Sequence, residues 1–182
     1  MKSTRLTALS DKELWFDLGQ ERITRITPRE FQRQFEHLDF DKALHYVAIP
    51  QLEPTVANDS ADERYQGRED LVPIFEWLKR KGVDRIIRVE VDDMEAPGHS
   101  DEAIEKALEH FQVEVLDWRR QDLCPFMISG IGRSLREIHL QWSGRNTVLR
   151  SWSEREGLAL TPSLEKIIIK QAEVSEPSPS NL

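Results

Sequence analysis

Carboxylates close to the ends of two strand-like segments are the first residues that could do chemistry. Asp92 and Asp93 follow RIIRVEV (85–91), and Asp117 lies near the end of VEVLDW (113–118). Three such carboxylates could coordinate a hard cation such as Mg²⁺ and support a metal-dependent hydrolase. Acidic residues between strands and helices more commonly cap the next turn or helix, and we favour that interpretation.

Aromatic, basic and hydroxyl residues occupy comparable positions after other strand-like segments. Ser143, Gly144 and Arg145 could hold an anion, but they lack the glycine spacings of a phosphate-binding loop, so an ordinary turn is favoured. Tryptophans at strand ends can anchor a protein partner or pack in the core, and we favour the core. The candidate binding edge comprises Asp92, Asp93, Asp117, Trp118, Arg119, Trp142, Ser143 and Arg145.

The remaining reactive residue types give no complete motif. The five histidines lack metal-ligand spacing. His45 and His139 lie within strand-like segments, where a neighbouring partner is expected, and His99 is interpreted as a surface residue before a helix. Cys124 stands between apolar neighbours, which is typical of an inert cysteine. We therefore assign no catalytic residue, no metal ligand and no cofactor.

Alternating strand and helix patterns must position the binding edge. Thr27, Pro28 and Glu30 indicate a capped helix start, and Ser100 indicates another. Leu71, Ile74, Phe75 and Leu78 form a helical stripe. The main strand-like segments are ALHYVAI (43–49), RIIRVEV (85–91), VEVLDW (113–118), REIHLQW (136–142) and LEKIIIK (164–170). This alternation predicts an α/β domain with a mainly parallel sheet, whose strand ends meet at one ligand-binding edge.

Two architectures satisfy that alternation. One is an open parallel sheet with helices on its faces, and the other is a leucine-rich-repeat-like arc. Leu135-x-x-Ile138-x-Leu140 recurs as Leu164-x-x-Ile167-x-Ile169, and more weakly as Ile86-x-x-Val89-x-Val91, which favours the arc. VEVLDW fits this pattern badly, which favours the open sheet.

Composition limits the partners and the compartment. The net charge of −8 disfavours nucleic acid and anionic membranes. The single cysteine fits a reducing compartment, and neither a signal segment nor a membrane-spanning run is evident, so we expect a cytoplasmic protein. We expect one domain over residues 13–170 with a surface loop at 51–67. Residues 1–12 are expected to be flexible, and the Pro/Ser-rich residues 171–182 to be disordered.

A family resemblance adds a specific expectation. The chain resembles a region of fungal multidomain proteins that precedes a subtilisin-like serine protease domain. The resemblance rests on LWFDL (14–18), TPREF (27–31), HYVAIPQ (45–51), DLVPIFEWLK (70–79), IIRVEVDDMEAPGHSDEAIEKAL (86–108), VLDWRRQDLC (115–124) and LREIHLQWSGRNTVLRSWSEREGL (135–158).

What the resemblance implies is an accessory region, not a protease. Neither an HGT nor a GTS motif, which would carry the catalytic His and Ser, occurs in the sequence. We therefore expect a non-catalytic interaction or regulatory domain whose partner is a protein, with a protease domain as one candidate. The alternative is a truncated member of a serine-type endopeptidase family.

Overall fold

The computed structural model describes residues 12–21, 23–54 and 67–171. Its strands are β1 (Trp15–Asp17), β2 (Ala43–Ile49), β3 (Arg85–Asp92), β4 (Gln112–Arg119), β5 (Glu137–Trp142) and β6 (Lys166–Gln171). Its helices are α1 (Pro28–Phe35), α3 (Val72–Arg80), α4 (Asp101–Leu108), α5 (Pro125–Ile131) and α6 (Asn146–Ser153). Short 3₁₀ turns lie at η1 (Leu18–Glu21), η2 (Gly132–Ser134) and η3 (Leu158–Leu160).

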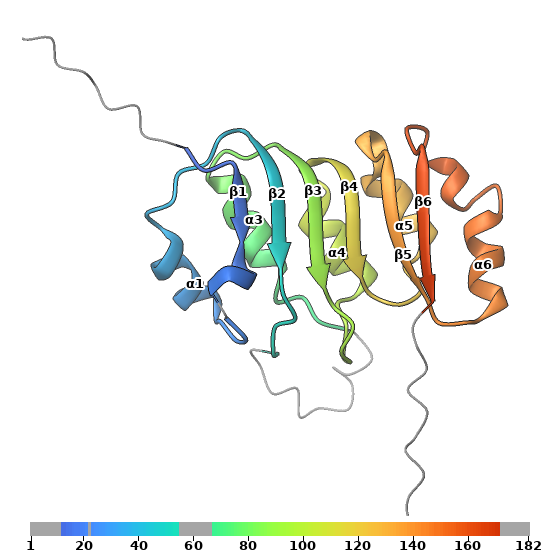
Figure 1. Cartoon of the computed structure of the whole chain (residues 1–182), viewed down its shortest axis with the longest axis horizontal. Helices are drawn as coiled ribbons and strands as arrows, with labels where there is room; N and C mark the ends of the chain where they lie inside the picture. The colour runs from blue at the N-terminus through green and yellow to red at the C-terminus, as the bar shows by residue number, and fades with distance from the viewer. Residues whose placement is uncertain (1–11, 22, 55–66, 172–182) are drawn as a thin grey trace, which may run out of the picture.

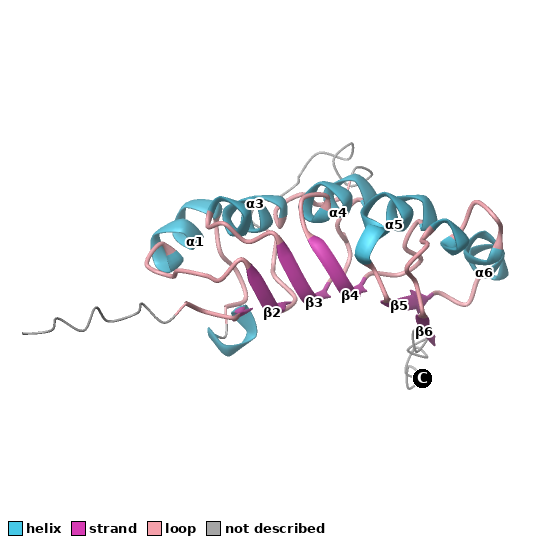
Figure 2. Cartoon of the chain, turned by 90° about the horizontal axis from the view of Figure 1, so that it is seen from above, coloured by secondary structure: helices cyan, strands magenta, loops and turns pink. Residues whose placement is uncertain are grey.

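All six strands run parallel in one sheet, and they follow one another in chain order. The predicted α/β fold with a parallel sheet is confirmed. Figure 1 looks onto one face of this sheet, with α3 and α4 behind it. The view from above places helices α1, α3, α4 and α5 in a row on one side of the strands (Figure 2). Sequential strands with helices on one face are features of the arc, and not of a sheet covered on both faces.

A repeated apolar triplet explains why the units stack. In each of four successive units the first, fourth and sixth residues of the motif are buried beneath the helices, and the strand pairing aligns them in rows. VEVLDW obeys the pattern after all, because Trp118 takes the sixth position. The triplets are Leu44, Val47 and Ile49; Ile86, Val89 and Val91; Val113, Leu116 and Trp118; and Leu135, Ile138 and Leu140.

The N-terminal end of the arc is closed by aromatic side chains. Phe16 of β1 meets Phe31, Phe35 and Phe40 edge-on, with ring centroids 5.8–5.9 Å apart. Trp77 of α3 joins them, 5.0 Å from Phe31. Such edge-to-face pairs add stabilisation beyond the apolar area that they bury.

Local helix signals are confirmed with one difference. Thr27 and Glu30 form a reciprocal capping box, and Ser100 accepts a hydrogen bond from the backbone N–H of Ala103 at 3.0 Å. The spacing of Val148, Leu149 and Trp152 predicts a helix from Asn146 to about Gly157, but helix α6 ends at Ser153. It stops because Glu154 takes an extended backbone conformation (ψ 164°).

The C-terminal end of the sheet differs from the N-terminal end. Ile167 and Ile169 of β6 continue the apolar rows, yet they are 45% and 47% exposed. Among the described residues, no strand pairs with the outer side of β6. No helix in the described part of the chain is long and apolar enough to cross a bilayer. The predictions for the N-terminal residues, most of the 51–67 loop and the C-terminal tail fall outside the described residues.

Candidate functional site

A pocket of about 460 Å³ lies at the carboxyl ends of β3 and β4. The connection from β3 to α4 forms most of its lining, from Asp93 to Glu102. Gly67 lies on one side, and Arg120 and Gln121, just after β4, complete the wall. The pocket is at the sheet edge where parallel topology predicts ligands.

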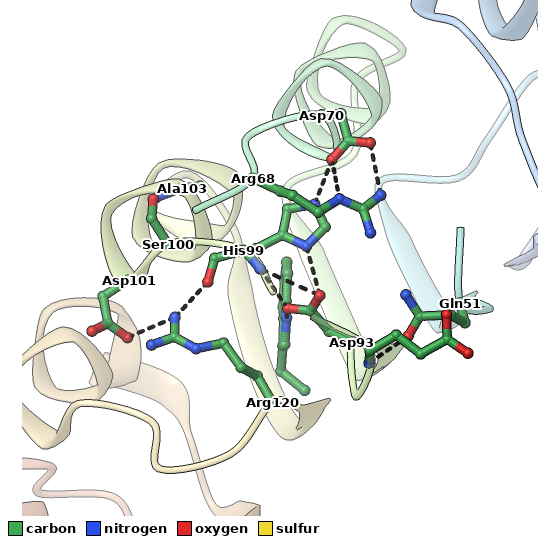
Figure 3. A network of polar contacts seen from close by, with 11 residues as sticks. Gln51, Arg68, Asp70, Asp93, His99, Ser100, Asp101, Ala103 and Arg120 are labelled. Atoms are coloured by element: carbon green, nitrogen blue, oxygen red, sulfur yellow. Dashed lines mark hydrogen bonds and ion pairs between the residues drawn. The ribbon is translucent and has the colours of Figure 1, made fainter. Parts of the chain in front are cut away.

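A buried polar network supports this pocket (Figure 3). The carboxylate of Asp93 accepts hydrogen bonds from the backbone N–H of His99 at 3.0 Å and from the indole N–H of Trp118 at 2.9 Å. It also lies 2.9 Å from Nδ1 of His99. On the other side of the ring, Nε2 lies 2.9 Å from the carboxylate of Asp70. Arg68 donates two hydrogen bonds to Asp70, at 3.0 and 2.8 Å.

Arg120 ties the same loop to the next unit of the arc. Its guanidinium donates to the carbonyl oxygen of His99 at 2.6 Å and pairs with Asp101 at 3.0 Å. From the other direction, the side chain of Gln51 accepts a hydrogen bond from the backbone N–H of Glu95 at 3.3 Å. Side chains from three neighbouring units therefore hold the β3–α4 connection (Figure 3).

The two carboxylates determine the charge of the imidazole. Burial alone would lower the pKa of His99, but the hydrogen bonds that its ring donates to Asp70 and Asp93 outweigh burial and raise the pKa above the ordinary 6.5. Burial alone would raise the pKa of Asp70, but the hydrogen bonds from His99 and Arg68 hold it well below the ordinary 3.8. The two carboxylates therefore favour the protonated form of His99, and Arg68 adds a positive charge beside Asp70.

These paired charges make the network a clamp on the β3–α4 connection. Every charged group in it already faces a partner of opposite charge. The hydroxyl oxygen of the neighbouring Ser100 accepts a hydrogen bond from the backbone N–H of Ala103, which caps helix α4. The network can therefore fix the pocket wall and respond to pH.

The interpretation of His99 as a surface residue is wrong, because its side chain is buried and only 3% exposed. Arg68 and Asp70, which reach the site from the segment before α3, were not among the predicted site residues. One local signal was available, because Asp93 precedes His99 by six residues and can close a loop onto it. No local signal points to the Asp70 side of the ring.

The three carboxylates that suggested a metal do not converge. Asp93 bonds to Trp118, whose side chain lies on the helix-covered side of the sheet. Asp117 precedes Trp118 in β4 and therefore faces the opposite side. Its carboxylate lies 3.5 Å from both Arg119 and His139 there. Among the described residues, no group of three metal-ligating side chains is arranged to hold an ion. The structure therefore does not support a metal-dependent hydrolase that uses Asp92, Asp93 and Asp117.

The turn after β5 is closed by its own contacts. The backbone N–H and the hydroxyl of Ser143 both donate to Asp122, at 2.9 and 2.5 Å. The indole N–H of Trp142 donates to the carbonyl oxygen of Arg145 at 2.9 Å. The carboxylate of Asp122 already occupies both donors of Ser143, which favours an ordinary turn here.

The helix-free face of the sheet carries a second, larger polar network. Glu90 accepts a hydrogen bond from the hydroxyl of Tyr46 at 3.0 Å and pairs with Arg119. Arg88 lies 3.5 Å from Glu90 and 3.7 Å from Asp117. Partial burial and the bond to Glu90 raise the pKa of Tyr46 above its ordinary value.

This network continues across β5 and β6. Nε2 of His139 lies 2.6 Å from Glu137, and Lys166 donates to the same carboxylate at 3.0 Å. The hydrogen bond from His139 and then that from Lys166 lower the pKa of Glu137. Oppositely charged side chains thus alternate along the helix-free face from Arg88 to Lys166.

An aromatic and basic row crosses the same face. Strand pairing places Trp15 beside Tyr46 and Tyr46 beside Arg88. Trp15 is 57% exposed, and its ring meets that of His45 edge-on at 6.2 Å. We call Trp15, Tyr46 and Arg88 the Trp–Tyr–Arg row. The two tryptophans of the candidate binding edge are not part of this row. Trp118 is fully buried, as favoured from the sequence, and Trp142 bonds within its own turn.

Comparison with protein-family models, with curated proteins and with solved structures finds no match for this chain. The geometry of the two polar networks is therefore the basis for any functional assignment.

Proposed function

We propose that this protein is a non-catalytic interaction module that binds a protein partner on the helix-free face of its sheet. The supporting observation is the placement of helices α1, α3, α4 and α5 on one side of the sheet, which leaves the other face without a covering α-helix in the described part of the chain (Figure 2). Stacked β-α units of this kind form extended binding surfaces in other repeat proteins.

The composition of this face supports a protein ligand. Tryptophan, tyrosine and arginine are the residue types most enriched among interface hot spots, and the Trp–Tyr–Arg row places all three side by side. The charged network next to the row, centred on Glu90 and Asp117, supplies a polar surround of both signs. Mixed charge of this kind contributes to specificity and orientation more than to affinity.

Affinity capture with matched variants tests the proposal. Tagged wild-type chain, Trp15→Ala and Arg88→Ala would each be incubated with cell extract, and captured proteins would be cross-linked and quantified by mass spectrometry. We expect a partner cross-linked to the helix-free face, with its recovery reduced about tenfold or more in Trp15→Ala, as for a hot-spot tryptophan.

The matched control is Phe126→Ala. Phe126 is also an exposed aromatic residue, 73% accessible, but it lies on helix α5 on the other side of the sheet. Its removal should leave partner recovery unchanged. Loss of the partner in Phe126→Ala together with full recovery in Trp15→Ala would contradict the proposed surface.

The sequence resemblance supplies the first partner to try. We propose a subtilisin-like protease domain of the fungal multidomain type, acting with this module in the cytoplasm, which the single cysteine supports. Titration of a purified protease domain of that type into the full chain by calorimetry tests this pairing. Absence of heat with both proteins folded would remove the protease as partner and leave the interaction surface itself to be tested by capture.

A further inference from the structure

We propose that the outer edge of β6 binds an extended acidic segment of a partner protein as a seventh strand. The edge is distinct from the Trp–Tyr–Arg row, which lies at the opposite end of the sheet on β1 to β3 (Figure 1). A test of binding at β6 is therefore independent of a test of the function proposed above.

Within the described part of the chain, the outer side of the β6 backbone has hydrogen-bonding groups that no strand uses. Lys166 donates its backbone N–H to the carbonyl oxygen of Arg136, at the start of β5, at 2.9 Å. In a parallel ladder each residue directs both of its backbone groups to the same side, and the next residue directs them to the other. The N–H and C=O groups of Ile167 and Ile169 therefore point away from β5, as they must to accept another strand.

The side chains of the same two residues are also incomplete in their packing. Ile138 and Leu140 of β5 are fully buried, whereas their neighbours in the register, Ile167 and Ile169, are 45% and 47% exposed. Helix α6 lies beyond β6 in both views of the molecule (Figures 1 and 2). An added strand would pair with the outer side of β6 and would extend the apolar rows by one unit.

The charges on β6 identify the segment. On the helix-free face, Lys166 has Glu137 on its β5 side and no acidic neighbour on its outer side among the described residues. Lys170 is exposed and has no ion pair in the described part of the chain. A partner strand with acidic residues on this face and apolar residues on the helix side complements both lysines and both isoleucines.

A second copy of this chain fits the edge poorly. Antiparallel pairing of two β6 strands about Ile168 would place Lys166 of each copy opposite Lys170 of the other. Like charges directly opposite each other destabilise a strand pair. Lysines on an exposed edge commonly prevent this kind of self-association.

The experiment uses the full chain and a short, end-blocked peptide in which glutamate alternates with valine, labelled for fluorescence anisotropy. We expect saturable binding that weakens about threefold in Lys170→Glu, while a lysine–valine peptide gains affinity for the same variant. Ile169→Pro removes an outward N–H without touching the β5 ladder and should weaken binding about fivefold or more.

Lys79→Glu is the matched control, because it makes the same charge change on the exposed end of helix α3 and should leave affinity unchanged. Circular dichroism and urea unfolding confirm that each variant is folded. The proposal is overturned if the glutamate–valine peptide does not bind at millimolar concentration. It is equally overturned if the affinity for the peptide is the same in wild type, Lys170→Glu and Ile169→Pro. It is also overturned if sedimentation shows a dimer that Ile169→Pro dissociates, since a second copy then occupies the edge.

Discussion

His99 has two carboxylates within 2.9 Å of its ring nitrogens, and its side chain is almost inaccessible to solvent. Removal of one member of such a group leaves the others buried without their counter-charge. The imidazole therefore contributes to stability through its charge as well as through its hydrogen bonds.

Replacement of His99 by glutamine should lower the free energy of unfolding by about 3 kcal/mol, because Asp70 and Asp93 lose the cation between them. Urea unfolding at neutral pH measures this loss. His110→Gln is the control, because His110 is an exposed residue beside Glu109 and its replacement should cost about 0.5 kcal/mol or less.

The same comparison has a defined pH dependence. The pKa of His99 is raised above 6.5 by folding, so its contribution is complete below pH 6.5 and is lost as the pH rises through the folded pKa. The pKa of Asp70 is lowered by folding, so its contribution is present above pH 3.8 and is lost as the pH falls through the folded pKa. The stability difference between wild type and His99→Gln should therefore shrink on the alkaline side. A difference that stays constant up to about pH 9 would show that the imidazole is neutral in the clamp.

At the scale of the strands, register neighbours of the same residue type occupy different environments. Ile138 of β5 is fully buried, and Ile167 of β6, which pairs with it, is 45% exposed. We expect Ile138→Ala to cost about 2–5 kcal/mol of unfolding free energy and Ile167→Ala about 1 kcal/mol. Chemical denaturation of the two variants measures the difference. Equal costs would mean that Ile167 is covered in solution by something that the described residues do not include.

Apolar spacing predicted most of the secondary structure, because burial on one side of a strand or helix leaves a local pattern. The segment 43–49 and the cap at Thr27 were predicted at their observed positions. The repeat was harder to recognise because Trp118 replaces a smaller aliphatic residue in the sixth position, and because the connection between β2 and β3 is much longer than the others. The two predicted architectures, the arc and the open sheet, are distinguished only by the sequential pairing of the strands.

The candidate sites were less predictable, since they depend on contacts between distant segments. Asp93 and Asp117 were grouped by their nearness to strand ends, but the alternation of side chains along β4 places Asp117 on the other face. The clamp on His99 requires Asp70 from a different unit, and the Trp–Tyr–Arg row requires three strands in register. Neither arrangement leaves a motif in one stretch of sequence.

The whole molecule should unfold unevenly from its two ends. Aromatic side chains around Phe16 cover the β1 end, whereas Ile167 and Ile169 at the β6 end are 45% and 47% exposed. Stacked units interact chiefly with the units beside them, so local stability follows the number of neighbours.

Hydrogen exchange followed by mass spectrometry should accordingly find the amides of β3 and β4 slowest, and those of β6 and α6 fastest. Helix α6 belongs with β6 because Trp152 is its only fully buried side chain among the described residues. Uniform protection from β2 to β6 would instead indicate a single cooperative unit.

The order of strands in the sheet is also the order in which the ribosome makes them. From β2 onward, each strand emerges when the neighbour on which it pairs already exists, and none has to wait for a partner that is synthesised later. The first layer can close once Trp77 has left the exit tunnel, because its ring completes the contacts of Phe16 and Phe31. The nascent chain can then lengthen its sheet one layer at a time during translation.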